Sequence, residues 1–434
     1  MEWIIAPVIL IVLVLLIILL KPKDVGGAYD PYFAQINSAL KKAGIGTARI
    51  LIDLDRLDLN IATIQANIPS DAHYRIVVKS IPCLELICKI RSKVHTNKFM
   101  LVHRPFIKVI LDNFDPGIDI LIGKPLPVFA LAEFYQEIQK TQIERAQSEI
   151  QWLIDTPAHL NEYLQYAIQN KLRLRVNLEI DIGLHRGGAA NNHDLKQLFD
   201  IIQQYPDHLV FSGFMGYEGH VPHAPGIFTS PRNAALREFA DNLSVYKSFI
   251  DYGRENYPSL FNETLTFNCG GSGTYSLFNN YPFITDIGIG GAVLRPVGYP
   301  AHFLNELLPA EFIATPVLKK RLGAVIPFIE GLSGLISWWN PNYQNSLEIY
   351  GGGWAGDFVA PKGVFCNPLL TDPPNQNLVP NQSTINTSSR TTLEIGDYVF
   401  YHPIQSDSMF QFEDIVLISG EEVKGIWKVF DRRY

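Results

Sequence analysis

Apolar runs without strict alternation recur between helical patterns from residue 48 to residue 291. Such runs are typical of strands that are buried on both faces of a parallel sheet. Strands that alternate with helices over this length indicate a (β/α)8 barrel or a doubly wound sheet. The nine expected strands are Ala48–Asp55, Tyr74–Lys79, Lys98–His103, Asp119–Gly123, Ile150–Asp155, Arg173–Asp181, Leu209–Tyr217, Thr264–Gly270 and Thr285–Gly291. A barrel needs one strand fewer, so Ala48–Asp55 is alternatively a partner of the C-terminal domain.

Helical patterns fill the gaps between these strands. The pattern Cys83–Val94 follows a proline, which is favoured in the first turn of a helix. The other expected helices are Leu57–Ile68, Val128–Arg145, Ala158–Gln169, His193–Gln204 and Pro231–Tyr257.

Beyond residue 310 the pattern changes to short apolar segments broken by Gly, Pro and Asn. The expected β segments are Ala324–Ser337, Ser346–Tyr350, Gly363–Cys366, Asp397–His402, Asp414–Ser419 and Val423–Val429. Pro373–Arg390 is rich in Pro, Asn, Ser and Thr and is expected to form a long loop. We therefore predict a second, mostly β domain over residues 311–434.

The N-terminus contains an uncharged, mostly aliphatic run, Ile4–Leu20. As a helix it would span roughly 26 Å, close to the thickness of the bilayer core. Lys21 and Lys23 follow the run and only Glu2 precedes it, so the positive-inside rule places the rest of the chain in the cytoplasm. A cleaved signal peptide is the rival hypothesis, but it carries its positive charge before the apolar stretch. The prediction is a single-pass anchor in the inner (cytoplasmic) membrane over residues 1–23, then a tether and lead-in over residues 24–45.

Charge and cysteine content exclude some classes of function. The net charge of −7 and the absence of a basic stripe argue against a nucleic-acid partner. The four cysteines form no CxxC pair, and Cys83 and Cys88 fit core-facing thiols better than metal ligands.

The strand candidate Tyr74–Lys79 ends in a lysine directly after branched apolar residues. Functional residues of parallel barrels gather at the C-terminal ends of strands. Burial of an amine favours its neutral, nucleophilic form, which suits Schiff-base chemistry. The alternative is a surface lysine whose amine reaches the solvent.

Two further strand ends carry residues that could bind a ligand or take part in catalysis. The segment Ile180–Gly188 contains Arg186, which is suited to anionic or heteroaromatic groups and is alternatively an ion-pair partner of Asp181. The segment Gly216–His220 contains Tyr217, which can stack on a ring or transfer a proton.

Late glycine-rich turns predict a phosphate site. The segment Asn268–Thr274 reads Asn-Cys-Gly-Gly-Ser-Gly-Thr, and Gly288–Gly291 follows it. Bare backbone N–H groups bind phosphate well, and the hydroxyls of Ser and Thr add donors. In barrels this site typically follows the seventh and eighth strands, which is where these turns fall.

Together these motifs resemble fold-type III pyridoxal-phosphate enzymes, in the D-threonine aldolase and D-serine dehydratase-like branch of the alanine racemase N-terminal-domain superfamily. The similarity covers roughly residues 46 to 300 and begins with Arg49–Leu57, Asn60 and Ile61. It implies an alanine-racemase-like (β/α)8 TIM barrel over residues 46–310, before the β domain.

The resemblance also implies roles for individual residues. Lys79 would form the Schiff base with pyridoxal 5′-phosphate, and Tyr217 would lie beside the cofactor and, like Lys79, carry protons. Arg186 would lie close to the cofactor ring. The residues implied to hold the phosphate are Gly271, Ser272, Gly273 and Thr274. Gly290, in the second glycine-rich turn, is a further expected cofactor-binding residue.

The implied activity is that of an enzyme which forms an aldimine on Lys79 and acts at Cα of a small amino-acid substrate. A lyase for β-hydroxy D-amino acids, as in D-threonine aldolase or D-serine dehydratase, ranks above a racemase. The alternatives are a non-catalytic cofactor carrier and an unrelated barrel enzyme for phosphate sugars. The family is usually a homodimer.

One departure from the branch makes a metal doubtful. The branch typically has a His-x-Cys or His-and-Asp metal site just before a strand that resembles Ile415–Ser419. No cysteine stands in the comparable stretch, which contains His402, Gln405, Ser406 and Asp407. His402 and Asp407 could bind a metal only in a shifted register, and ordinary loop residues fit them better.

Overall fold

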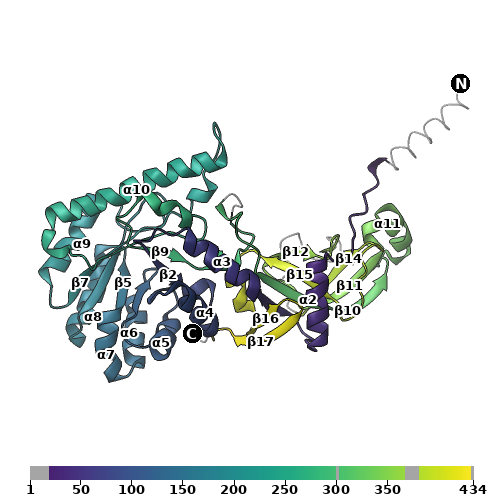
Figure 1. The fold of residues 1–434 in the computed structure, drawn as a ribbon, viewed down its shortest axis with the longest axis horizontal. Helices are drawn as coiled ribbons and strands as arrows, with labels where there is room; N and C mark the ends of the chain where they lie inside the picture. Colours follow the sequence, from purple (N-terminus) through teal and green to yellow (C-terminus); the bar gives the residue numbers. More distant parts are fainter. Residues whose placement is uncertain (1–18, 300–302, 367–380, 432–434) are drawn as a thin grey trace, which may run out of the picture. The chain divides into compact units, whose positions relative to one another are not determined.

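The computed structural model describes residues 19–299, 303–366 and 381–431, which divide into two compact units (Figure 1). The first unit comprises the described residues up to Leu54 together with Glu311–Ile404 and Asp414–Ile426. The second comprises Asp55–Ala310, Gln405–Glu413 and the described residues from Trp427. In the sequence, the chain passes between the units after Leu54 and again after Ala310. The predicted domain bounds stay predictions.

In the second unit, the described strands β2 to β9 are parallel and close into an eight-stranded barrel. Its strands are β2 (His73–Val77), β3 (Lys98–Leu101), β4 (Asp119–Ile122), β5 (Ile150–Ile154), β6 (Leu174–Glu179), β7 (Leu209–Met215), β8 (Thr266–Cys269) and β9 (Asp286–Ile289). Most of their side chains are buried because each strand faces the barrel interior on one side and helices on the other. The predicted (β/α)8 barrel is confirmed.

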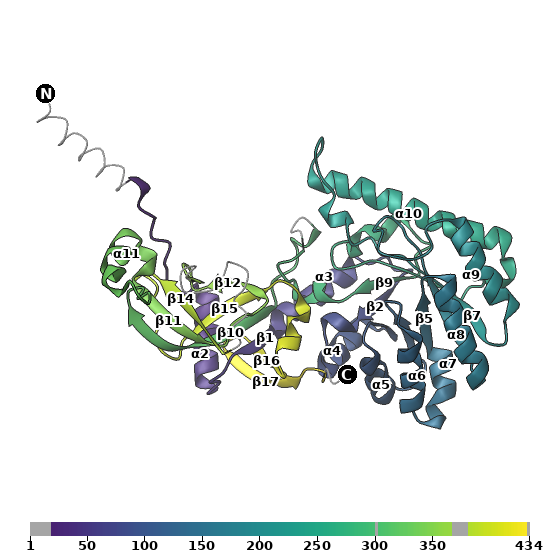
Figure 2. The same ribbon diagram turned by 180° about the vertical axis from the view of Figure 1, so that it is seen from behind.

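Helices lie on the outside of the barrel, and all of them except α3, which precedes β2, follow a barrel strand (Figures 1 and 2). They are α3 (Leu54–Ala66), α4 (Leu84–Val94), α5 (Arg104–Asn113), α6 (Val128–Glu137), α7 (Ile143–Glu149), α8 (Pro157–Asn170), α9 (Asn192–Gln204) and α10 (Pro231–Asn256). The sequence interpretation missed α5 and merged α6 with α7 into one helix.

The first unit contains a mostly antiparallel sheet, nine-stranded within the described residues, as predicted for a β domain. Its strands are β1 (Arg49–Asp53), β10 (Glu311–Leu322), β11 (Asn345–Tyr350), β12 (Gly356–Ala360), β13 (Phe365–Cys366), β14 (Gln382–Thr387), β15 (Tyr398–Pro403), β16 (Asp414–Ser419) and β17 (Glu422–Lys428). Strand β1 lies between β10 and β16, so the run Ala48–Asp55 takes the second of its two predicted places.

Helices α2 (Pro31–Lys42) and α11 (Ser333–Trp339) complete the first unit and correct the sequence interpretation in two places. The expected lead-in over residues 24–45 contains α2, whose Phe33 and Leu40 pack into the core of the sheet. The expected β segment Ala324–Ser337 is wrong, because this stretch forms turns and the start of α11. The true strand, β10, lies just before it.

The predicted membrane anchor falls almost entirely on residues 1–18, which lie outside the described residues. Among the helices that the structure describes, none is long and apolar enough to cross a membrane. The anchor and the cytoplasmic location stay predictions.

The barrel interior contains a buried ion network at the N-terminal ends of its strands. Arg75 is fully buried and reaches Asp286 at 2.8 Å and Asp119 at 2.7 Å. A second contact of 2.9 Å makes the bond from Arg75 to Asp286 bidentate. Gln151 extends the network to Asp119 and Thr266. The opposite ends of the strands are thereby left for a site, as is usual in this fold.

Candidate active site

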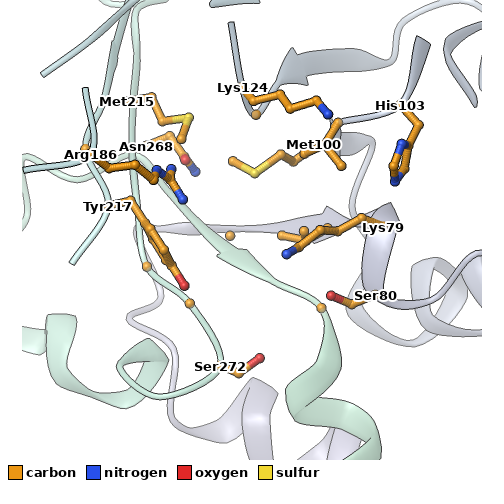
Figure 3. A pocket seen from close by; sticks show the side chains of 18 of the residues that line it. Lys79, Ser80, Met100, His103, Lys124, Arg186, Met215, Tyr217, Asn268 and Ser272 are labelled. Carbon is orange, nitrogen blue, oxygen red and sulfur yellow. The ribbon is translucent and has the colours of Figure 1, made fainter. Parts of the chain in front are cut away.

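A cavity of about 340 Å³ lies at the C-terminal ends of the barrel strands. It brings together Lys79, Arg186, Tyr217, Ser272 and Gly290, which the sequence had placed on five different segments (Figure 3). The other residues that line it are Val77, Ser80, Met100, Val102, His103, Gly123, Lys124, Met215, Gly216, Asn268, Gly270, Gly271, Gly288 and Tyr299.

Lys79 follows β2 in a single turn of 3₁₀ helix, Val78–Ser80. Both neighbours are buried, and their burial fixes the backbone from which the half-buried lysine side chain projects. Its amine points across the cavity toward Tyr217 (Figure 3). Because Lys79 forms no ion pair with any described residue, its amine is available to a ligand.

The charge of the cavity wall has one sign. Lys79, Lys124 and Arg186 line the cavity, and no Asp or Glu is among the described lining residues. A wall with this charge favours a ligand with several negative charges, because opposite charges attract strongly where the dielectric constant is low.

Tyr217 and Arg186 form one side of the cavity. The guanidinium of Arg186 lies over the Tyr217 ring, 5.1 Å from its centroid, and its other contact is to Glu179 at 3.6 Å. Burial raises the pKa of the Tyr217 hydroxyl, and Arg186 only partly offsets this, so Tyr217 is neutral and can donate a proton. Asp181 is not the partner of Arg186, because it accepts hydrogen bonds from His185 and from the Gly183 amide.

Glycines create the space for the Tyr217 ring and for the end of β9. A Cβ atom at Gly219 would lie 2.5 Å from the ring, and one at Gly271 would lie 3.0 Å from it. A Cβ atom at Gly290 would lie 2.8 Å from the carbonyl oxygen of Val77. Larger residues at these positions would displace the ring or narrow the cavity.

The cofactor-binding residues expected in the glycine-rich turns divide into two groups. Gly271, Ser272 and Gly290 line the cavity, whereas Gly273 and Thr274 do not. Thr274 is buried, and its hydroxyl donates to the carboxylate of Glu218 and accepts from the Gly271 amide at 3.1 Å.

Glu218 holds this loop in place through hydrogen bonds. Its carboxylate is fully buried and also accepts hydrogen bonds from the Cys269 thiol at 2.8 Å and from the Gly270 amide at 3.2 Å. Thr274 therefore shapes this glycine-rich turn through Glu218, and Ser272 is the hydroxyl residue of the turn that lines the cavity.

The sequence interpretation did not single out several lining residues. His103 follows β3, Gly123 and Lys124 follow β4, and Ser80 follows Lys79. Their positions could have identified them, because each residue stands at or just beyond the C-terminal end of an expected strand, where functional residues of a barrel gather. Asn268 and Tyr299 lie within or after the glycine-rich segments and carried no separate signal.

No group of three or more His, Cys, Asp or Glu side chains suited to a metal ion occurs in the part of the chain that the structure describes. His402 lies in β15, opposite Asp357 of β12. Asp407 lies in the 3₁₀ helix Ser406–Gln411.

Comparison with known proteins now decides the family of the barrel. Residues 52–251 match the family described as alanine racemase, N-terminal domain. Over these residues the chain is an alanine racemase N-terminal domain. This match confirms the expected membership among fold-type III pyridoxal-phosphate enzymes, and pyridoxal phosphate is the cofactor of that family. The homodimer implied by the resemblance stays a prediction.

Solved structures show the same fold at low sequence identity. D-threo-3-hydroxyaspartate dehydratase from Delftia sp. HT23 is 14% identical, with a TM-score of 0.66 over 89% of this chain and 98% of its own. D-threonine aldolase from Filomicrobium marinum is 16% identical, with a TM-score of 0.61 over 88% and 97%. Alanine racemase from Bacillus anthracis is 13% identical, with a TM-score of 0.63 over 88% and 98%. Among curated proteins, none matches the chain.

The residues of this alanine racemase N-terminal domain fit pyridoxal phosphate. The cofactor needs an amine for its aldehyde, donors for its phosphate and a slot for a flat ring. Lys79 provides the amine. The turn Gly270–Ser272 and Gly290 line the cavity, and at their glycines an added Cβ would meet neighbouring atoms and reduce the space for a ligand. Tyr217 and Arg186 would border the ring.

Proposed function

We propose that the chain is a pyridoxal-phosphate-dependent lyase that acts at Cα of a β-hydroxy D-amino acid. One observation carries the proposal: the amine of Lys79 and the loop Gly270–Ser272 line one cavity whose described wall holds no acid. The aldolase and the dehydratase that share the fold support a lyase, and the racemases that share it make racemisation the second candidate.

The cofactor, when bound, withdraws electrons from the bonds to Cα of an amino acid. The chain decides which bond is exposed to this pull. Lys79 would hold the cofactor through Nζ, and it would accept or return a proton once a substrate amine has replaced it. The Oη atom of Tyr217, which stays protonated, would donate a proton to a departing hydroxyl.

An apolar floor beneath the cavity would keep water away from the reacting atoms. Met100 and Met215 pack with Leu121 and Leu153 there, and Val77 and Tyr217 pack against this cluster. Exclusion of water strengthens the electrostatic contacts between the cationic wall and its ligand.

Incubation of the cofactor-loaded protein with D-threonine, D-serine and D-alanine, followed by product analysis, tests the proposal. We expect glycine with an aldehyde, or a keto acid with ammonia, from a hydroxylated substrate. Formation of L-alanine from D-alanine with no cleavage of either hydroxylated substrate would establish the racemase instead. No turnover of any of the three would contradict both.

Replacement of Tyr217 by Phe keeps the ring beside Arg186 and removes only the hydroxyl. We expect kcat to fall by about 10² to 10⁴, the usual contribution of a positioned acid or base, with cofactor affinity nearly unchanged. Steady-state kinetics and a cofactor titration measure the two effects. An unchanged kcat would remove Tyr217 from the proton transfer.

Lys124 is a candidate anchor for the substrate carboxylate. It follows β4, which is the third barrel strand, and therefore lies across the barrel mouth from the phosphate turn after β8. It lines the cavity and pairs with no described acid. We expect Lys124→Ala to raise KM by about tenfold or more, the effect of losing one charge-assisted hydrogen bond. Lys108→Ala, on the outside of α5, is the matched control and should leave KM unchanged.

A further inference from the structure

A run of exposed large apolar side chains lies in the first unit between residues 322 and 338. We name as the apolar face the residues Leu322, Phe328, Ile329, Leu332, Leu335 and Trp338. Phe328 is 97% exposed and Leu322 is 83% exposed. Several large apolar side chains exposed within one short segment are a candidate interaction site.

Helix α11, which contributes Leu335 and Trp338, is unusual because none of its residues is buried. Its sequence, Ser-Gly-Leu-Ile-Ser-Trp-Trp, is nevertheless mostly apolar. A helix with such a composition normally stabilises a protein by burying one side against a partner. Within the described residues its neighbours only partly bury Ile336 and Trp339, so the helix has apolar area left to bury.

Hydrogen bonds hold the apolar face in place. The Gly323 amide donates to the carbonyl of Gln344 at 2.7 Å, and the Ser337 hydroxyl donates to the carbonyl of Tyr343 at 3.0 Å. A Cβ atom at Gly323 would lie 2.7 Å from the hydroxyl of Ser333, so the end of β10 packs closely on α11. The segment that carries the apolar face is therefore held in a defined position on the unit.

The chain that leads to the N-terminal apolar run is fastened beside this face. The amine of Lys21 lies 5.1 Å from the centre of the Trp338 ring. Asn342 donates to the carbonyl of Lys23 at 2.8 Å and accepts from the Val25 amide at 3.0 Å. Both figures show this segment leaving the unit next to α11 (Figures 1 and 2).

The described end of the apolar run does not cover the face. Leu19 and Leu20 are 77% and 69% exposed, so their side chains do not pack onto Trp338 or Leu335. The uncharged run Ile4–Leu20, which is long enough to span a bilayer, thus has its C-terminal end beside the apolar face, and Lys21 directly follows it.

We propose that the apolar face docks on the surface of a lipid bilayer that contains anionic lipids. Tryptophan beside lysine is the composition favoured at the membrane interface, where the ring is buried and the amine reaches the headgroups. Lys23 is exposed on the same segment as Lys21 and adds positive charge, against the acids Asp24 and Glu330. Docking would hold the first unit against the membrane instead of leaving it on a free tether.

Quenching of tryptophan fluorescence by brominated lipids tests the proposal on the full chain. The protein is reconstituted into vesicles of phosphatidylcholine and phosphatidylglycerol with bromine near the headgroup end of the acyl chains. We expect Trp338→Phe to remove a clear share of the quenched emission, because a docked indole lies at this depth. Trp427→Phe, on β17 and outside the face, is the matched control and should leave the quenched emission nearly unchanged.

A second variant tests the face without touching Trp338. Phe328→Asp with Leu335→Asp should abolish the Trp338 share of the quenching while the protein stays in the vesicle fraction. Equal quenched emission in Trp338→Phe and Trp427→Phe would overturn the proposal. So would a detergent-solubilised dimer that the double variant dissociates, because the face would then bind a second copy of the chain.

Discussion

Replacement of Lys79 by Ala is expected to abolish turnover and covalent retention of the cofactor. The variant loses the only group that we assign both to hold the cofactor and to move a proton. We therefore expect a fall in rate of at least about 10³-fold. The wild-type protein should show a visible absorbance band that borohydride fixes to one peptide containing Lys79, and the variant should show neither the fixed peptide nor the band.

The cavity itself offers the control for this experiment. Lys124 lines the same space as Lys79, so a misassigned amine would reveal itself as borohydride labelling of Lys124 that persists in Lys79→Ala. The variant Lys124→Ala should keep the band and its borohydride sensitivity. A colourless wild-type protein that takes up no pyridoxal phosphate would instead favour an enzyme for phosphate sugars.

The barrel strands and the positions of Lys79, Arg186 and Tyr217 could be predicted because their signals are local. A continuous apolar run followed by a polar residue marks a buried strand and its end, and parallel strands bring such ends together. Topology therefore gathered these residues into one cavity although they lie far apart in the sequence.

The parts that could not be predicted depend on partners far away in the sequence. Thr274 looked like a phosphate ligand, but its hydroxyl bonds to Glu218, a residue of the preceding strand end. Strand β1 precedes the barrel, but it pairs with β10 and β16 from the other end of the chain. Local pattern could not choose between such partners.

Replacement of Arg75 by Met is expected to lower the free energy of unfolding by several kcal/mol. Arg75 is fully buried between Asp286 and Asp119, and Asp286 is itself fully buried. Without Arg75, Asp286 keeps Lys98 at 3.5 Å and Asp119 keeps Arg175 at 3.2 Å as ion-pair partners. Removal of one partner of a buried ion pair costs about 3 to 5 kcal/mol, and these remaining contacts place the expected loss at the lower end. Chemical denaturation measures the loss. Arg104→Met is the matched control, because Arg104 pairs with exposed acids and its loss should cost below about 1 kcal/mol.

The pH dependence separates a buried ion network from simple loss of packing. Burial raises the pKa of Asp286, but Arg75 outweighs this and holds the pKa below its usual value, and the same holds for Asp119. Carboxyls with a lowered pKa contribute stability that is present above the unfolded-state pKa of about 4 and is lost as the pH falls below it. The difference in unfolding free energy between wild type and Arg75→Met should therefore shrink as the pH falls, because protonation removes the pairing in the wild type and the buried charge in the variant.

A second substitution then identifies the cause of the loss. Asp286→Asn in the Arg75→Met background removes the buried charge that has lost its bidentate partner, so it should recover part of the lost stability. It retains an acceptor for the Asn268 amide, which donates to Asp286 in the wild type. If the double variant is less stable than Arg75→Met at neutral pH, the loss comes from packing and not from the buried carboxylate that has lost Arg75. Arg75 would then stabilise the barrel mainly by filling space in its interior.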